Sequence, residues 1–181
     1  MEQYRSHVAG GIFFVHGFLD LPTCRAVRAG MDAGVVDPAE VIDDDIETQG
    51  DVRRAESIDV DARILGEVER RLDEARGSVA AFFALPLTGR EGAGFLRYGP
   101  GGFYRPHRDR AIGGAWPGAA RRRVTAVVFL NSGEFTGGLL RVGGQPIAPE
   151  AGMLAAFLAE TVHEVTPVRG GVRDTVVDWY Y

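Results

Sequence analysis

From Phe95 onward the chain is a succession of short apolar or alternating segments, each bounded by glycine, proline, asparagine or aspartate. Segments of this length and composition are typical of β-strands. The six clearest are GFLRYG, RVTAVVFLN, GLLRVG, GMLAAFL, TVHEVTPV and RDTVVDWYY. The 25 glycines and 9 prolines are scattered between the periodic segments, which indicates many turns rather than a disordered tract. The second half of the chain is therefore predicted to form a β-sandwich or a small barrel.

The first half of the chain carries helical patterns. Residues 11–18 form an aromatic, strand-like run, and the segment LPTCRAVRAGMDAG is predicted to be a helix with Pro22 in its first turn. From the expected N-cap Asp61, apolar residues recur every three or four positions, as in an amphipathic helix, with Gly77 as a candidate break. The fold class that follows is α+β and mainly β, with the N-terminal helices packed on one outer face.

The size of the chain favours one domain. Its 181 residues, 45% of them hydrophobic, suit a single sizeable core. We expect one domain over residues 1–181, with helical support over about residues 19–90 and the β core over about residues 91–181. The N-terminal residues lack the pattern of a secretory signal, and no apolar run approaches the roughly 20 residues that span a bilayer. A cytoplasmic protein without a membrane segment is expected.

Arginine supplies all 20 basic residues, and this composition excludes some chemistry. Without lysine, the chain has neither a Schiff-base lysine nor a P-loop lysine. The formal net charge of −5 and the pI of about 5.4 give no general attraction to nucleic acid or to an anionic membrane, so neither is an expected partner. The single cysteine, Cys24, excludes an internal disulfide and is expected to be a small buried residue.

An acidic segment covers residues 32–51, which hold eight carboxylates and no basic residue. A calcium loop needs a fixed alternation of oxygen ligands, which this segment does not have. A solvated loop is therefore the favoured interpretation, and a divalent-cation loop is the alternative.

The segment FLRYGPGGFYRPHRDR places His107 two residues before Asp109. Residues two apart on a strand face the same side, so we expect this imidazole and this carboxylate side by side. His163 lies 56 residues after His107 in another strand-like segment, from which it could face the pair across the β core. Two imidazoles and one carboxylate that leave three positions open form the facial triad suited to non-haem Fe(II) and dioxygen chemistry.

Spacing alone leaves open the alternative that these three residues are unrelated polar side chains. The other two histidines are not expected to be ligands. His7 is predicted in a frayed terminus, and His16 in the first strand as a satisfied core or surface residue.

Arg173 follows His163 by ten residues, beyond the turn RGG. In a hairpin centred near Gly170, His163 would lie opposite Val177 and Arg173 opposite Pro167, on one face and about 13 Å apart along it. An arginine fork there could bind the far carboxylate of a short dicarboxylate whose keto-acid end chelates the metal.

Arg173, and not Arg169, is predicted to bind this carboxylate because of the direction in which each side chain is expected to point. Arg169 is expected in the turn and solvated. Arg173 begins an alternation with Thr175, Val177 and Trp179 that predicts an inward face.

The order His107-x-Asp109, His163 and then Arg173 in GVRDTVVDW resembles the iron and 2-oxoglutarate dependent dioxygenase superfamily. Within it, YGPGGFYRPHRD, RVTAVVFLN, GGLL and HEVTPVRGGVR are similar to the prolyl 4-hydroxylase branch, and the resemblance covers most of the chain. It implies a double-stranded β-helix, or jelly roll, that uses Fe(II), 2-oxoglutarate and O2, with ascorbate as a stimulant.

The resemblance also implies residue roles. The His-x-Asp pair and His163 would hold Fe(II), and Arg173 would bind the distal carboxylate of 2-oxoglutarate. Thr175 and Tyr98 match positions at which some members contact this cosubstrate. Phe129 stands where prolyl hydroxylases commonly have a tyrosine, so one phenol contact is missing.

Two sister activities differ at single positions. Halogenases of the superfamily replace the metal carboxylate with a small residue, and the presence of Asp109 favours hydroxylation instead. Nucleic acid demethylases carry a second arginine six residues after the first, where this chain has Trp179. The expected activity is hydroxylation of an unactivated C–H bond in a prolyl peptide or in a free or tethered amino acid. The alternative is a catalytically silent jelly-roll protein that binds metal and dicarboxylate as a sensor or scaffold.

The substrate is less constrained than the cofactors. Residues 97–123 hold seven arginines and one acid, and these arginines either face solvent or form a positive rim for an anionic small molecule or peptide. Residues 110–122 are either a lid over the substrate or a plain surface loop. Tyr104, Trp116 and Trp179 are the candidate substrate contacts.

Overall fold

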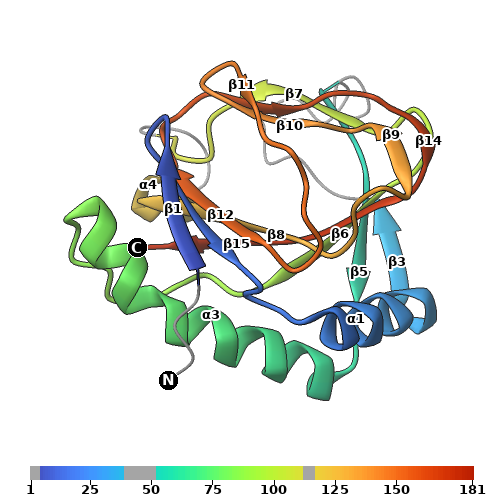
Figure 1. Cartoon of the computed structure of the whole chain (residues 1–181), viewed down its shortest axis with the longest axis horizontal. Helices are drawn as coiled ribbons and strands as arrows, with labels where there is room; N and C mark the ends of the chain where they lie inside the picture. The colour runs from blue at the N-terminus through green and yellow to red at the C-terminus, as the bar shows by residue number, and fades with distance from the viewer. Residues whose placement is uncertain (1–4, 39–51, 112–116) are drawn as a thin grey trace.

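Most strands of the protein belong to two sheets that face each other (Figure 1). The computed structural model describes residues 5–38, 52–111 and 117–181. The larger sheet contains, in spatial order, β1 (Arg5–Ala9), β2 (Ile12–His16), β12 (Leu154–Leu158), β8 (Val124–Phe129), β15 (Arg173–Tyr180), β6 (Gly94–Tyr98), β5 (Glu56–Asp59) and β3 (Val35–Pro38).

The facing sheet is smaller. It contains, in spatial order, β11 (Gln145–Pro146), β10 (Leu140–Val142), β13 (His163–Val165), β7 (Phe103–His107) and β4 (Arg53–Arg54). A separate pair, β14 (Val168–Gly171) and β9 (Phe135–Gly137), lies at one end of the sandwich (Figure 1). Among the described strands, no pairing closes the two main sheets into one barrel.

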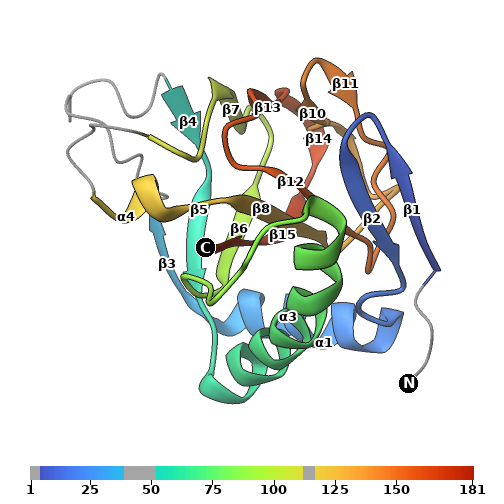
Figure 2. The same ribbon diagram turned by 90° about the vertical axis from the view of Figure 1, so that its left-hand side faces the viewer.

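Helices α1 (Leu21–Ala33) and α3 (Ala62–Phe83) cover the face of the larger sheet that points away from the smaller one (Figure 2). A short helix, α4 (Pro117–Arg121), precedes β8. The Asp20 carboxylate caps α1 by accepting from the Thr23 N–H (2.7 Å), and Pro22 lies in the first turn. Helix α3 begins at its predicted N-cap, Asp61.

The predicted break at Gly77 is wrong, because α3 continues through it to Phe83. Glycine in a helix interior is unfavourable by only about 1 kcal/mol relative to alanine. The apolar face of α3 continues past this position with Val79, which is completely buried. Burial of that face outweighs the glycine penalty.

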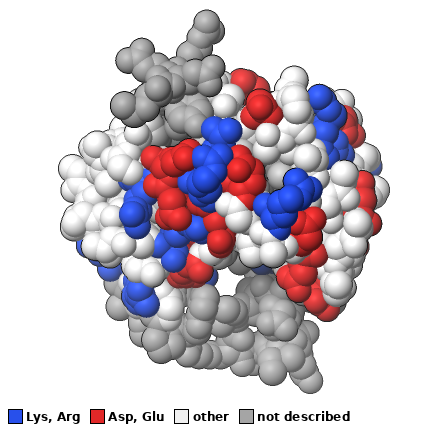
Figure 3. All heavy atoms as spheres, turned by 90° about the horizontal axis from the view of Figure 1, so that it is seen from below, with Lys and Arg blue, Asp and Glu red and all other residues white. Residues whose placement is uncertain are grey.

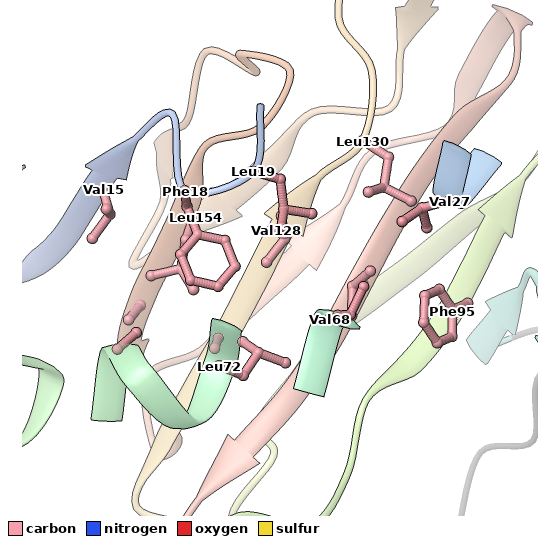
Figure 4. Packing of buried hydrophobic residues seen from close by; sticks show 14 of the residues in the cluster. Val15, Phe18, Leu19, Val27, Val68, Leu72, Phe95, Val128, Leu130 and Leu154 are labelled. Carbon is pink, nitrogen blue, oxygen red and sulfur yellow. The ribbon is translucent and has the colours of Figure 1, made fainter. Parts of the chain in front are cut away.

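The first core lies between the helices and the larger sheet. Val68 and Leu72 of α3 point toward Val128 of β8 and Leu154 of β12 (Figure 4), and all four are completely buried. Each such side chain contributes about 1.5–3 kcal/mol through removal of apolar surface from water. This packing fixes the helices on the sheet.

The second core lies between the two sheets. In β8, Val128 faces the helices, whereas Val127 and Phe129 belong to the inter-sheet cluster. Strands covered on both faces carry apolar residues at consecutive positions, which explains the continuous run in RVTAVVFLN. The inter-sheet core is therefore lined from both sheets.

The outer side of the helices carries charges of both signs (Figure 3). On α3, the Arg70 guanidinium contacts the Glu67 carboxylate at 2.7 Å and also pairs with Glu74. Surface pairs of this kind contribute little stability. The mixture of signs fits a solvated face.

The structure confirms the predicted architecture, which is mainly β with helices on one outer face. The six predicted strands are present as β6, β8, β10, β12, β13 and β15. His7 does not belong to a frayed end, because it lies in β1 with its ring stacked on Phe14 (centroids 4.6 Å apart). Residues 39–51, most of the acidic segment, lie outside the described residues. None of the described helices has the length and apolarity needed to cross a membrane.

Candidate active site

His107 and His163 are direct partners across the antiparallel strands β7 and β13. Their ring centroids lie 4.1 Å apart. The ring of Tyr104 stacks on His107 (3.5 Å), and the ring of Phe157 lies 4.8 Å from that of His163. Both imidazoles therefore lie against the inter-sheet core.

Asp109 joins the two histidines from just beyond the end of β7. The expectation that it shares a strand with His107 is wrong, since β7 ends at His107. Its N–H and that of Arg110 both donate to the carbonyl oxygen of Ala159, each at 3.0 Å. These bonds hold the carboxylate 3.5 Å from Nε2 of His107 and 3.2 Å from Nε2 of His163.

Backbone contacts orient both imidazoles. Nδ1 of His107 lies 2.8 Å from the Arg105 carbonyl oxygen, and Nδ1 of His163 lies 2.9 Å from the Thr161 carbonyl oxygen. A carbonyl oxygen only accepts, so Nδ1 carries the hydrogen in each neutral ring and Nε2 keeps its lone pair. The three potential ligand atoms all lie within 4.8 Å of one another. This donor set suits Fe(II).

The charges of the cluster follow from burial and pairing. Burial raises the pKa of Asp109. The contacts with Nε2 of His107 and His163, which donate to the carboxylate when the rings are protonated, outweigh burial and hold that pKa well below its usual value. Burial lowers the pKa of His107. In His163 burial acts in the same direction, but the contact with Asp109 outweighs it, and the pKa is raised. At neutral pH the cluster thus offers a charged carboxylate and at least one neutral imidazole, as metal binding requires.

Arg173 lies in the same inter-sheet core. It is 2% exposed, and burial lowers the pKa of its guanidinium. The guanidinium carbon lies 5.0 Å from the centre of the Tyr98 ring and 5.6 Å from that of Phe129. Nη1 donates to the Thr175 hydroxyl at 3.4 Å, and Nε is buried with no hydrogen-bond partner among the described residues.

A buried guanidinium of this kind is costly unless an anion compensates it. Among the described residues, Arg173 forms no ion pair. Its neighbour Asp174 points to the other face of the sheet, where Arg97 (2.7 Å) and Arg28 (2.9 Å) hold its carboxylate. The orphaned Nε and the missing counterion therefore fit a small dicarboxylate ligand.

The predicted hairpin between His163 and Arg173 is wrong. Strand β14 pairs with β9, and β15 pairs with β6 and β8, so the two residues lie in different sheets. The predicted inward face of β15 is confirmed, because Val177 packs against the inter-sheet core. Arg169 is exposed, as expected, but it lies in β14 and not in a turn.

The candidate substrate residues have different surroundings. Tyr104 stacks on His107, and its pKa is raised to about 12 by burial. Trp179 lies on the inward face of β15 with a buried indole N–H that has no hydrogen-bond partner among the described residues. Trp116 and the rest of residues 112–116, the centre of the predicted lid, lie outside the described residues.

Sequence reasoning missed several residues next to Asp109. The Thr125 hydroxyl donates to its carboxylate at 2.7 Å. Arg122 donates to the Asp109 carbonyl oxygen (3.4 Å), lies over the Trp179 ring (3.6 Å) and forms two bonds with Glu91 (2.9 and 2.8 Å). Only the local excess of arginine hinted at such a cluster.

Residues 93–181 match the family model of the 2OG-Fe(II) oxygenase superfamily. The chain is 37% identical over 93 residues to a PKHD-type hydroxylase of Nitrobacter winogradskyi and 34% identical over 90 residues to one of Shewanella baltica. The chain belongs to the 2OG-Fe(II) oxygenase superfamily. These two matches cover 47% of the chain and 41% and 40% of the respective relatives, so the chain spans less than half of their length.

Solved structures place this superfamily member in the prolyl 4-hydroxylase-like branch. A Pseudomonas putida prolyl-4-hydroxylase is 29% identical, with a TM-score of 0.74 over 94% of this chain and 91% of that one. A prolyl hydroxylase from Trichoplax adhaerens, in complex with a hypoxia inducible factor peptide fragment, shares the fold with a TM-score of 0.73 at 20% identity. This match covers 96% of this chain and 84% of the Trichoplax chain. Fe(II) and 2-oxoglutarate are the cofactor and cosubstrate of the superfamily, and the residues above fit both.

Proposed function

We propose that the protein is a 2-oxoglutarate-dependent hydroxylase that acts on a prolyl peptide or on a free or tethered amino acid. One observation carries the proposal. The His107, Asp109 and His163 cluster contacts the inter-sheet core through Phe157. Arg173, which has no ion-pair partner in the described parts of the chain, contacts the same core through Tyr98. A metal and a dicarboxylate are the two ligands that this pair of sites can hold at once.

Each residue then has a role in binding. His107, Asp109 and His163 hold Fe(II), while Arg173 binds the distal carboxylate of 2-oxoglutarate with Thr175 and Tyr98 beside it. When bound, Fe(II) and 2-oxoglutarate supply the oxidising chemistry that transfers an oxygen atom from O2 to a C–H bond.

The protein contributes geometry and a dry environment. The apolar side chains of the inter-sheet core exclude water around Arg173, which strengthens its bond to a carboxylate. Thr125 holds the Asp109 carboxylate in place (2.7 Å). Tyr104 and Trp179 are the proposed substrate contacts, the first stacked on His107 and the second on the inward face of β15.

We further propose an anionic substrate. Among the described residues, three of the seven arginines form ion pairs: Arg97 with Asp174 (2.7 Å), Arg122 with Glu91 (2.8 Å) and Arg110 with Glu160 (3.6 Å). Arg105 and Arg108 flank His107 in the sequence, and both are exposed. A KM that rises with ionic strength supports this proposal, and a KM independent of salt contradicts it.

Succinate formation tests the activity. The protein is supplied with Fe(II), ascorbate, 2-oxoglutarate and a pool of prolyl peptides and amino acids, and products are examined for the gain of one oxygen atom. Succinate above the level of a metal-free control, coupled to an oxygenated product, supports the hydroxylase. Binding of metal and 2-oxoglutarate without succinate from any pool supports the alternative of a sensor or scaffold. A peptide pool in which alanine replaces proline distinguishes prolyl substrates from others.

A further inference from the structure

Asn131 lies where the chain leaves β8 beside Arg173. The ladder between β8 and β15 ends at Phe129. One more backbone bond follows, from the Leu130 N–H to the Asp174 carbonyl oxygen at 3.0 Å. The chain then turns away from β15, and the remaining peptide groups near Arg173 need another partner on this side.

The side-chain amide of Asn131 is that partner. Its Nδ2 donates to the carbonyl oxygen of Val172 at 2.8 Å, and its Oδ1 accepts from the N–H of Asp174 at 3.0 Å. Only one orientation of the amide satisfies both groups, since a carbonyl needs a donor and an N–H needs an acceptor. Asn131 is 2% exposed, so water competes little for these bonds. The amide thus bonds to the residues immediately before and after Arg173.

The side chain of Arg173 has little room to compensate for a shift of its own backbone. The rings of Tyr98 and Phe129 lie beside its guanidinium, 5.0 and 5.6 Å from the central carbon. A Cβ added at Gly138 would come within 3.2 Å of its Cδ. In a core packed this closely, a displaced Cα carries the guanidinium with it.

We infer that Asn131 is a positioning residue for Arg173. The two hydrogen bonds of the Asn131 side-chain amide align the guanidinium with the far carboxylate of 2-oxoglutarate. The inference rests on the proposed function, in which Arg173 binds that carboxylate. An arginine fork needs two parallel bonds to a carboxylate and loses strength when it is displaced. Loss of the Asn131 amide therefore weakens 2-oxoglutarate binding about 10-fold, which corresponds to about 1.4 kcal/mol.

The test is calorimetric titration of 2-oxoglutarate into the Mn(II)-loaded protein, in which turnover is avoided. Asn131→Ala removes both bonds. Asn131→Asp keeps the size and the acceptor for Asp174 but loses the donor for Val172, so it is expected to weaken binding as well. Both variants should retain the wild-type affinity for Mn(II), because the metal cluster depends on β7 and β13 in the other sheet.

Two controls separate positioning from general loss of stability. Ser132→Ala removes a bond to the Ala151 N–H (3.3 Å) at the next position and should change 2-oxoglutarate affinity by less than about twofold. Val128→Ala destabilises the helix-facing core and should also leave the affinity within about twofold.

The outcomes distinguish this inference from the proposed function. Wild-type affinity in both Asn131 variants overturns the inference alone, as does an equal loss of affinity in Val128→Ala. A wild-type protein that binds no 2-oxoglutarate, or an Arg173→Ala variant that binds it normally, overturns the proposed function and the inference with it.

Discussion

His107 and His163 face each other as a register pair of β7 and β13, with ring centroids 4.1 Å apart. This relationship joins two distant parts of the chain in the smaller sheet, while Arg173 lies in the larger one. The proposed metal and dicarboxylate sites are therefore carried by facing sheets, and the inter-sheet core lies between them.

Removal of Asp109 should abolish turnover and leave the fold intact. Asp109→Ala removes the only carboxylate of the described His/Asp/His cluster, and we expect metal affinity to fall by about 100-fold or more. The apolar cores hold the domain together, so thermal melts of the variant and of the chelator-treated protein should stay within about 4 °C of the wild type. Unfolding on chelation would show instead that the site is structural.

Arg173 and Arg169 should differ sharply in their effect on 2-oxoglutarate. Arg173→Ala should raise the apparent dissociation constant about 30-fold or more, because one carboxylate of the ligand would be desolvated without a partner. Arg169 is exposed, and Arg169→Ala should change the constant by about threefold at most. Equal effects in titration experiments would contradict the assignment of Arg173.

Arg173→Met is a separate test of the buried charge. Its guanidinium forms no ion pair among the described residues, so an apolar side chain of similar length should not lower the thermal midpoint of the ligand-free protein. A drop as large as that of an ordinary core truncation would indicate a counterion within the protein.

Asp174 should be a strong contributor to stability. Its buried carboxylate accepts from Arg97 (2.7 Å) and Arg28 (2.9 Å). Asp174→Ala therefore deprives two partly buried guanidinium groups of this shared carboxylate. We expect the free energy of unfolding in urea to fall by about 3 kcal/mol. The matched control is Glu134→Ala, which removes a half-exposed partner of Arg28 (2.9 Å) and should lower it by about 0.5 kcal/mol. Similar losses in the two variants would contradict this view of the network.

Cys24 should be unreactive in the native protein, and it should make the free energy of unfolding vary with pH in the alkaline range. Burial raises the pKa of its thiol from 9.0 to about 11, so alkylation at pH 8 should be slow until the chain is unfolded. Because the folded pKa is the higher one, its contribution to stability is complete below pH 9 and is lost as pH rises toward about 11. Cys24→Ala should lack this component in urea titrations at several pH values, and rapid labelling of the native thiol would contradict its burial.

Local patterns were sufficient for much of the fold. The cap at Asp61, the proline in the first turn of α1 and the periodicity of α3 depend on neighbours within a few residues, and the helix starts were predicted from them. The inward facing of Arg173 follows from the two-residue period of a strand, and it too was predicted.

Strand pairing was decided by the tertiary structure. The sequence contains the His-x-Asp pair, His163 and Arg173, but a hairpin between the last two was predicted from their nearness in the chain, and it does not exist. Residues 168–171 pair with β9 instead, and His163 finds its partner in β7. The residues of a strand do not by themselves determine which strand it pairs with, because the order of strands in a sheet is set only when both cores are buried together. For the same reason Thr125, Arg122 and Asn131, which support the site from other segments, were visible only in the folded chain.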